Sequence, residues 1–393
     1  MPKLELLSFR SSLLTVPAAR RAGKGKQQKR FYRPELDALR FCAFLAVYVH
    51  HSLYTQLITG LGQGKNQWVY FLIDLQNACA LGVPLFFTLS AYLITSLIQL
   101  EMSCTGELDT RKFYIRRVLR IWPLYFFALL IALVVGIVWP GEKLTLHHLI
   151  WFLLMGGNLY VLAYGMLPLT TAHLWSISVE EQFYLFWPLL ARFLNRTGVL
   201  VTCLLIIVFS VVSVVLMSQK ITPEQIWFQS TPHLIFFAAG SLLAVGAHSQ
   251  PCGKSAVKAF VLLFFGSVTL FVAEASTKLL DFDFNSHSGI AGGYALTALG
   301  CVTLIYGALH MPARFVPHGM VNLGKISYGL YVYHAFVFRG LRNLPIGIPH
   351  PGIAVSLIAL PITIVLAKVS YRFLEKPFLT LKARFETVAS RNP

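Results

Sequence analysis

The stretch YRPELDALRFCAFLAVYVHHS, residues 32–52, decides how the rest of the chain is interpreted. It is an apolar run that carries Asp37 and Arg40 near its start and His50 and His51 near its end. Ionisable groups inside a membrane are energetically costly and usually functional. In a helix, Arg40 and His51 lie within about 20° of each other and about 16 Å apart along the axis, whereas His50 points about 100° away. We therefore expect one helix face to carry a cation near the membrane surface and an imidazole near mid-depth.

The composition predicts a membrane protein. The chain has 393 residues, of which 56% are hydrophobic and only 12% are charged, a balance typical of a polytopic membrane protein. The net charge of +17 could indicate nucleic-acid binding. However, the Lys and Arg residues concentrate in terminal tails and short loops, as the positive-inside rule predicts, so we exclude nucleic acid as a partner. The six cysteines are scattered without metal-ligand spacing and are expected to be small core residues.

The apolar runs predict an all-α fold of about ten transmembrane helices. Runs of roughly the 20 residues needed to cross a bilayer lie near 36–57, 78–99, 118–139, 198–217, 226–247, 256–275, 289–310, 325–342 and 352–371. Residues 145–194 hold two shorter apolar pieces, 147–165 and 179–191, separated by Gly, Pro and polar residues. Loop charge places 140 outside and 192 inside, so this stretch crosses an odd number of times. One piece is then broken or re-entrant, which makes 156–184 a candidate cavity wall.

Three regions follow from this pattern. Residues 1–33 are expected to form a basic cytosolic tail, because no convincing signal-peptide pattern is present. Residues 34–375 form the transmembrane domain, and residues 376–393 form a cytosolic C-terminal tail. Both chain termini are therefore expected in the cytosol.

His51 is the leading candidate for a general base, since imidazole can take up and return a proton near neutral pH. A buried core histidine is the alternative interpretation, and taken by itself it would be favoured. Arg40 on the same face and the nearby carboxylates reverse that preference.

Glu180 and Glu181 are adjacent acids at the start of an apolar helix, in HLWSISVEEQFYLFWP. Ser178 and Glu181 have the spacing of a capping box, so Glu181 has a structural explanation. Glu180 has none, and we predict that it orients an imidazole or binds the acceptor.

The segment RKFYIRRVLRIWPLY, residues 111–125, is rich in arginine. Positive-inside anchoring would explain these residues in an arbitrary membrane protein. Arg117 and Arg120, however, are three residues apart and share a helix face at the cytosolic surface. Guanidinium groups match phosphates well, so a phosphorylated donor such as coenzyme A could bind there.

Several further residues have weaker signals. Ser90 lies inside an apolar run, where a bond to its own helix is the alternative. Arg372 and Glu375 are three residues apart and predict an ion pair at the cytosolic rim. His147 and His148 have no third ligand nearby, so we expect no metal. The supporting residues predicted for the site are Asp37, Ser90, His173, Ser176, Tyr328, His334 and Glu375.

Six motifs in order resemble the bacterial integral-membrane acyltransferase-3 family over roughly residues 31–380. They are YRPELDALR followed by ten residues and His, GVPLFFTLSAYLI, RRVLRIWPLY, LWSISVEEQFYLFWP, LGKISYGLYVYHAF and SYRFLEKPF. The sequence departs from the family pattern at Ala38 and Ala91, where Gly is usual, and at Pro84, where Asp is frequent. These departures leave the proposed chemistry intact but weaken any inference about packing around the first two spans.

The resemblance implies specific residue roles. The Arg-x10-His pair of the family falls on Arg40 and His51, its Arg-x-x-Arg on Arg117 and Arg120, and its motif glutamate on Glu180. These imply a donor site at the arginines and a catalytic site at His51 and Glu180.

The resemblance also implies an O-acyltransferase of a bacterial inner membrane. Acyl-CoA, most simply acetyl-CoA, would be a co-substrate and no bound cofactor is expected. The acceptor would be a hydroxyl of a cell-surface glycan, such as an exopolysaccharide, a lipopolysaccharide or a lipid-linked precursor, with the bilayer as a further partner. Acylation of a secreted small molecule such as a macrolide sugar is the alternative, and direct transfer and an acyl-histidine intermediate both remain open. Because no esterase-like domain follows in this sequence, every step is expected within the membrane part.

A transporter and an inactive subunit are the competing classes. A secondary transporter or flippase would use the same buried charges as a binding or proton-relay site, but it predicts broken helices in two related halves. The sequence shows one broken region and no related halves. An inactive interaction subunit would have no need of His51 and Glu180.

Overall fold

The computed structural model of the chain describes residues 31–60, 67–165, 170–248, 253–280, 289–343 and 351–388. Every regular element in these ranges is a helix, which confirms the predicted all-α class. The main helices are α1 (Pro34–Gly60), α2 (Gln67–Ala80), α3 (Gly82–Thr105), α4 (Thr110–Val138), α5 (Leu146–Leu153), α6 (Gly157–Tyr164), α7 (Trp175–Ala191), α8 (Arg196–Met217), α9 (Pro223–Phe228), α10 (Ser230–His248), α11 (Ala256–Thr277), α12 (Ile290–His310), α13 (His318–Lys325), α14 (Ser327–Asn343), α15 (Pro351–Ser370) and α16 (Lys376–Ala383). Short 3-10 helices lie at Pro140–Glu142, Ala172–Leu174 and Ala313–Phe315, and a π-helical turn lies at Tyr371–Glu375. Of the expected N-terminal tail only residues 31–33 are described, and residues 389–393 also lie outside the described ranges.

Seven helices in the described part of the chain are long and apolar enough to cross a membrane. They are Gln67–Thr105, Thr110–Val138, Arg196–Met217, Ser230–Ala247, Ala256–Thr277, Ile290–His310 and Ala354–Ala383. The first unites α2 with α3, and the last unites α15 with α16. The runs expected at 36–57 and 325–342 also form helices, α1 and α14, but they are not among the seven. The chain is therefore a polytopic helical protein, and the count of ten spans remains a prediction.

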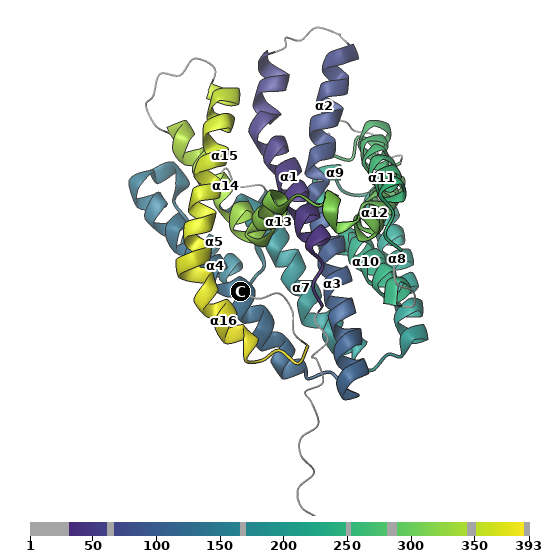
Figure 1. Cartoon of the computed structure of the whole chain (residues 1–393). Coiled ribbons are helices and arrows are strands. Elements are labelled where there is room, and N and C mark those ends of the chain that lie inside the picture. Colours follow the sequence, from purple (N-terminus) through teal and green to yellow (C-terminus); the bar gives the residue numbers. More distant parts are fainter. Residues whose placement is uncertain are drawn as a thin grey trace, which may run out of the picture.

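Helix α1 lies at the centre of the bundle. It packs against α2, α3, α12, α13, α14 and α15, and Figure 1 shows α2 and α3 on one side of it and α14 and α15 on the other. The contact with α13 is very close, since a Cβ on Gly324 would lie 1.8 Å from the carbonyl oxygen of Asp37. Glycine at 324 therefore permits α13 to fix the part of α1 that carries Asp37 and Arg40.

Small and polar residues hold α3, α7 and α10 together. A Cβ on Gly240 would lie 2.2 Å from the carbonyl oxygen of Thr88, so the backbones of α10 and α3 approach closely. The hydroxyl oxygen of Thr95 on α3 lies 2.9 Å from that of Ser241 on α10. The same oxygen accepts a hydrogen bond of 2.9 Å from the indole N–H of Trp187 on α7. Close backbone approach with interhelical hydrogen bonds is typical of helix packing in membranes.

The stretch 145–194 is broken, as predicted. Helices α5 and α6 have eight residues each, about 12 Å, too short for a hydrocarbon core of about 30 Å. Between them Met155 has a left-handed backbone conformation with φ 54°. Helix α7 follows with 17 residues. The first apolar piece, 147–165, is therefore the one that cannot span.

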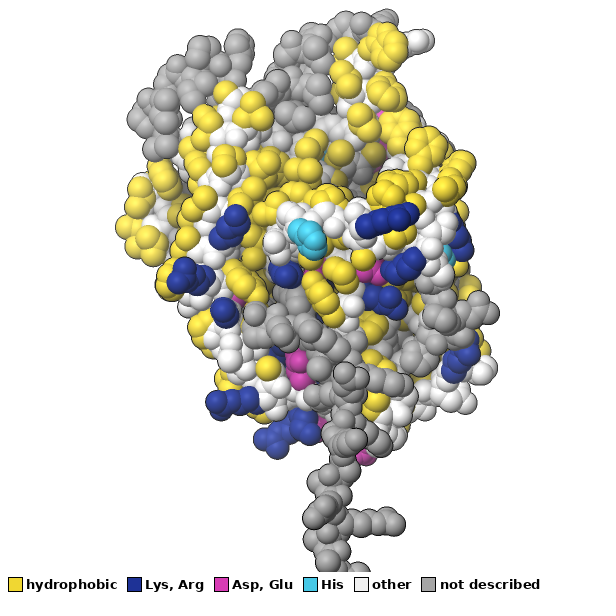
Figure 2. Space-filling model, in the orientation of Figure 1, with side chains coloured by type: hydrophobic (Ala, Val, Ile, Leu, Met, Phe, Trp, Pro, Cys, Tyr) yellow, Lys and Arg dark blue, Asp and Glu magenta, His cyan; other side chains and the backbone are white. Residues whose placement is uncertain are grey.

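The basic side chains, which loop charge predicts to face the cytosol, gather toward one end of the molecule. Figure 2 shows Lys and Arg side chains across the middle and lower part of the face in view, whereas the upper part is mainly hydrophobic. Helix α4 begins at this end, where Asp109 accepts a hydrogen bond of 2.9 Å from the backbone N–H of Lys112. That N–H and the Lys112 side chain lower the pKa of the Asp109 carboxyl below its ordinary value.

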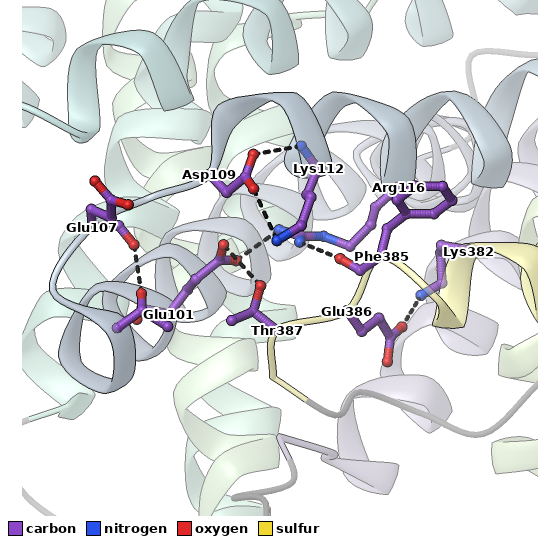
Figure 3. A network of polar contacts seen from close by, with 10 residues as sticks. Glu101, Glu107, Asp109, Lys112, Arg116, Lys382, Phe385, Glu386 and Thr387 are labelled. Atoms are coloured by element: carbon purple, nitrogen blue, oxygen red, sulfur yellow. Dashed lines mark hydrogen bonds and ion pairs between the residues drawn. The ribbon is translucent and has the colours of Figure 1, made fainter.

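Helix α16 packs against α4 at the same end. It occupies the first part of the predicted C-terminal tail, and the residues after it are tied to α3 and α4 (Figure 3). Thr387 donates to Glu101 at 3.2 Å, and Arg116 donates to the carbonyl oxygen of Phe385 at 2.9 Å.

Candidate active site

A cavity with an empty volume of about 780 Å³ lies among α1, α3, α4, α7 and α14. Seven side chains predicted for the site line it together, although they are distant in sequence. They are Arg40, Ser90, Arg117, Arg120, Ser176, Glu180 and Tyr328. Apolar residues including Val83, Phe86, Phe87, Ile94 and Ile177 complete the lining. We call this space the inner cavity.

Glu180 is held at the wall of the inner cavity by two hydroxyl groups. Ser90 on α3 and Tyr184 on α7 both donate hydrogen bonds to its Oε1 atom. The carboxylate is therefore fixed between two helices. Among the contacts of the described residues it does not meet His51, so the interpretation that Glu180 orients His51 directly has no support in this geometry.

The capping box predicted at Ser178 and Glu181 is wrong. Helix α7 already begins at Trp175, so Ser178 lies inside it and is fully buried. Its hydroxyl accepts a hydrogen bond of 3.1 Å from the backbone N–H of Gly157. Glu181 instead accepts one of 3.0 Å from the indole of Trp122 on α4. Glu181 therefore still has a structural role, but it links α7 to α4 instead of capping the N-terminus of α7.

Arg116 and Arg117, adjacent on α4, have different environments. Arg116 donates to Glu101 at 2.8 Å, which anchors it (Figure 3). Arg117 lies over the rings of Phe113 and Tyr184, 5.4 and 5.6 Å from their centroids. Its Nε atom is buried without a hydrogen-bond partner. Arg116 is therefore a structural residue, whereas Arg117 retains a donor that a bound anion could use.

A second cavity adjoins the inner one, since Arg40, Leu93, Arg117 and Arg120 line both. Its empty volume is about 830 Å³. The charged residues that line it are Arg33, Arg40, Arg117, Arg120 and Lys382 with Asp37 and Glu386. We call this space the basic cavity. Five cations against two carboxylates favour an anionic ligand.

Asp37 supports one of the shared arginines. It is 3% exposed, and its Oδ1 atom lies 3.2 Å from the guanidinium of Arg40. This ion pair with Asp37, which lies on the same helix, holds the Arg40 side chain at the junction of the two cavities.

His51 contacts another histidine. Its Nδ1 atom lies 2.8 Å from Nε2 of His334 on α14, and the two rings stack with centroids 5.1 Å apart. His50 faces elsewhere, as predicted from helix geometry, and its Nδ1 donates to the carbonyl oxygen of Gln76 at 3.2 Å. The amide of Gln76 in turn donates to the carbonyl oxygen of His50 at 3.0 Å. His50 thus has a structural role between α1 and α2.

A polar network connects the histidines with the inner cavity. Ser176 and Tyr331, which line the cavity, have hydroxyl oxygens 2.6 Å apart. Tyr331 donates to the carbonyl oxygen of His173 at 3.0 Å. The His173 ring lies 5.1 Å from that of His334. His51 itself lines neither cavity and is separated from the inner one by this layer.

Two predicted site residues, Tyr328 and Glu375, have further contacts with their own surroundings. Tyr328 donates to the carbonyl oxygen of Ile121 on α4 at 3.0 Å. Glu375 is buried in the π-helical turn, 3.5 Å from the hydroxyl of Ser370. The ion pair expected between Glu375 and Arg372 is absent among the described residues, because Arg372 lies over the ring of Phe373.

Asn158 lies within the predicted cavity wall, residues 156–184, but it does not line the inner cavity. It is fully buried, and its amide donates to Ser230 at 2.9 Å and to the carbonyl oxygen of Phe228 at 3.3 Å. Among the described residues of 156–184, those that line the inner cavity all belong to α7.

Two contacts of the site were not predicted from the sequence. Tyr184 lies four residues after Glu180, so helical spacing could have identified it. The pairing of His51 with His334 joins residues 283 positions apart, and no local pattern indicates it. Within the described residues, His, Cys, Asp and Glu form no group of three that could hold a metal.

Fold and site together define a polytopic helical membrane protein with an arginine-lined polar cavity among its helices. A family model described as an acyltransferase domain matches residues 33–372. The chain therefore belongs to the acyltransferase-3 family, as its motifs predict.

Similar proteins carry related names. Over 391 residues the chain is 28% identical to a Staphylococcus aureus (strain MSSA476) protein named "Putative O-acetyltransferase", covering 91% of this chain and 59% of that protein. It is also 25% identical over 375 residues to O-acetyltransferase OatA of Staphylococcus aureus (strain NCTC 8325 / PS 47). That alignment covers 88% of this chain and 57% of OatA. The chain thus spans less than two thirds of the length of these relatives. No solved structure matches it.

Proposed function

We propose that this protein is an O-acyltransferase that moves an acyl group, most simply acetyl, from acyl-CoA to a hydroxyl of a cell-surface glycan. The observation that carries the proposal is the convergence of Arg40, Arg117, Arg120 and Glu180 from three helices on one cavity. These are the positions to which the family motifs assign function. The membrane would be a bacterial inner membrane, with both termini in the cytosol.

The donor would occupy both cavities. Its phosphates suit the basic cavity, because guanidinium groups form strong charge-assisted hydrogen bonds with phosphate oxygens. The buried Nε of Arg117 supplies a donor at the junction. The thioester arm would extend into the inner cavity, whose lining combines apolar side chains with the Ser90, Ser176 and Tyr331 hydroxyls.

His51 would act as the general base. The acceptor oxygen attacks the thioester carbonyl carbon while its proton passes to His51. The carbon–sulfur bond then breaks, and the coenzyme A thiolate takes the proton back from His51, which returns the base to its neutral state. A positioned base of this kind contributes about 10²- to 10⁴-fold to the rate. The acyl group would have to pass the Ser176–Tyr331 layer to meet His51, which lies about 16 Å from Arg40 along α1.

The donor assignment is tested by removing the two cavity arginines. We expect the double variant Arg117→Ala/Arg120→Ala to raise the apparent KM for acetyl-CoA at least about tenfold, since charged hydrogen bonds are lost. The matched control is Arg111→Ala/Lys112→Ala, which removes two exposed cations from the same helix outside both cavities. Both are assayed in membranes at equal protein levels. If both double variants keep the wild-type donor KM, the arginines have only a topological role.

The acceptor is proposed to be a polyhydroxylated sugar. Polar groups such as the half-buried Glu180 and the buried Ser176 can hydrogen-bond the hydroxyls of a sugar, and a site of this kind rejects acceptors that lack hydroxyls. Deleting the gene should lower ester-linked acetyl in purified surface polysaccharide or lipopolysaccharide, measured by mass spectrometry. Unchanged acetyl content in every glycan fraction would refute the glycan acceptor, and loss of acetyl from a secreted small molecule would identify the alternative.

A further inference from the structure

His334 is placed to control the hydrogen bonding of His51. It is 0% exposed on α14, whereas His51 is exposed. The two imidazole planes differ by only 3°. The His51 ring thus stacks on a fixed neighbour, and the 2.8 Å contact between His51 Nδ1 and His334 Nε2 engages one nitrogen of each ring.

The other nitrogen of His334 fixes its proton. Nδ1 of His334 lies 2.5 Å from the backbone carbonyl oxygen of Tyr331. A carbonyl oxygen can only accept, so His334 Nδ1 must carry the hydrogen. A neutral imidazole has a single N–H, and Nε2 of His334 is therefore an acceptor.

The same logic determines the tautomer of His51. Because Nε2 of His334 accepts, Nδ1 of His51 must donate. The remaining nitrogen of His51, Nε2, then holds a lone pair. That is the state a general base needs, since only an unprotonated nitrogen can take the proton of an attacking hydroxyl.

The surroundings favour a neutral His334. Its ring lies within 6.5 Å of the rings of Phe44, Tyr48 and Phe338 and within 5.6 Å of those of His173 and Tyr331. These contacts among the described residues include no carboxylate. An unpaired charge is costly in such a place, so the ring stays neutral and acts through its lone pair.

We propose that His334 is a positioning residue that holds His51 in the Nδ1–H tautomer, with His51 Nε2 free as the base. The proposal rests on the proposed function of His51. When His51 takes up a proton, its Nδ1–H bond to His334 becomes charge-assisted and strengthens. We expect loss of this bond to lower kcat about 10- to 100-fold, the usual effect of losing a hydrogen bond to a group that becomes charged.

Two variants test this role in full-length protein in membranes. His334→Phe keeps an aromatic ring but has no acceptor, whereas the side-chain carbonyl of His334→Gln can accept from His51. We expect the Phe variant to lose kcat with an acetyl-CoA KM within about twofold of wild type, and the Gln variant to recover most of the loss. Wild-type kcat in a folded Phe variant would overturn the proposal, and so would a folded Gln variant as impaired as the Phe variant.

A second measurement does not depend on activity. Solid-state NMR of the ¹⁵N-histidine-labelled wild-type protein reports which ring nitrogen of each histidine is protonated, and the His51 signals are assigned by their loss in His51→Asn. We expect protonated Nδ1 and unprotonated Nε2. The opposite tautomer would refute the inference. Full acyl transfer by His51→Ala would instead refute the proposed function and leave the tautomer result standing.

Discussion

Replacing Gly324 with alanine tests whether α13 fixes the position of α1. The new Cβ would lie 1.8 Å from the carbonyl oxygen and 2.4 Å from the carbonyl carbon of Asp37. Real Cβ atoms essentially never approach other atoms below 3.0 Å, so the helices must separate by about 1.2 Å at this point (3.0 − 1.8). The atoms in the way are backbone and cannot rotate aside.

The expected cost follows from this overlap. Overpacking of a tight contact costs about 1–3 kcal/mol, and the better helix propensity of alanine offsets up to about 1 kcal/mol. Because the clash is with backbone atoms that cannot rotate aside, we take a net destabilisation of about 1–2 kcal/mol, which should lower the melting temperature by about 2–8 °C at roughly 2–4 °C per kcal/mol. Because Arg40 lies one turn after Asp37 on α1, the same shift should also raise the acetyl-CoA KM.

Gly319→Ala is the matched control. It makes the same change in the same helix, but nothing lies within 4 Å of its new Cβ. We expect this variant to be as stable as wild type or more stable by up to about 1 kcal/mol. Both variants are measured by thermal unfolding of purified protein in one detergent. Equal melting temperatures for Gly324→Ala and Gly319→Ala would show that the α1–α13 contact does not constrain α1.

Two further predictions concern the base and the topology. His51→Ala should abolish acyl transfer while His50→Ala keeps much of it, because the hydrogen bonds of His50 join α1 to α2 through Gln76. Assays at matched membrane levels that show equal losses would contradict the assignment of His51. Cysteines introduced at Lys143 and Arg196 should be labelled by an impermeant reagent from opposite sides of the membrane, because the stretch between them is expected to cross an odd number of times. Labelling of both from one side would mean that the number of crossings between them is even.

Much of the architecture could be predicted from local sequence. Long apolar runs can satisfy their backbone groups in a membrane only as helices, so the position of each run indicated a helix. The glycines and polar residues between 145 and 194 likewise predicted a break, because they interrupt the apolar run. The facing directions of His50 and His51 required only the helix repeat of 3.6 residues.

Contacts between helices could not be predicted in this way. Ser178 and Glu181 have capping-box spacing, yet α7 starts three residues earlier and both side chains bond to other elements. Helix propensity and spacing describe only interactions within one segment, whereas these partners come from the tertiary fold. The ion pair predicted for Arg372 and Glu375 is likewise not among the ion pairs of the described residues, because Arg372 lies over the ring of Phe373.

The sequence by itself determined which residues are ionisable within apolar runs, and hence that Arg40, Arg117, Arg120, His51 and Glu180 are candidates for function. Only the tertiary structure decided how they are grouped. It placed the arginines and Glu180 around one cavity and left His51 beyond it, beside His334. The physical reason is that local periodicity fixes the direction of a side chain on its own helix, whereas packing between distant helices decides what that side chain meets.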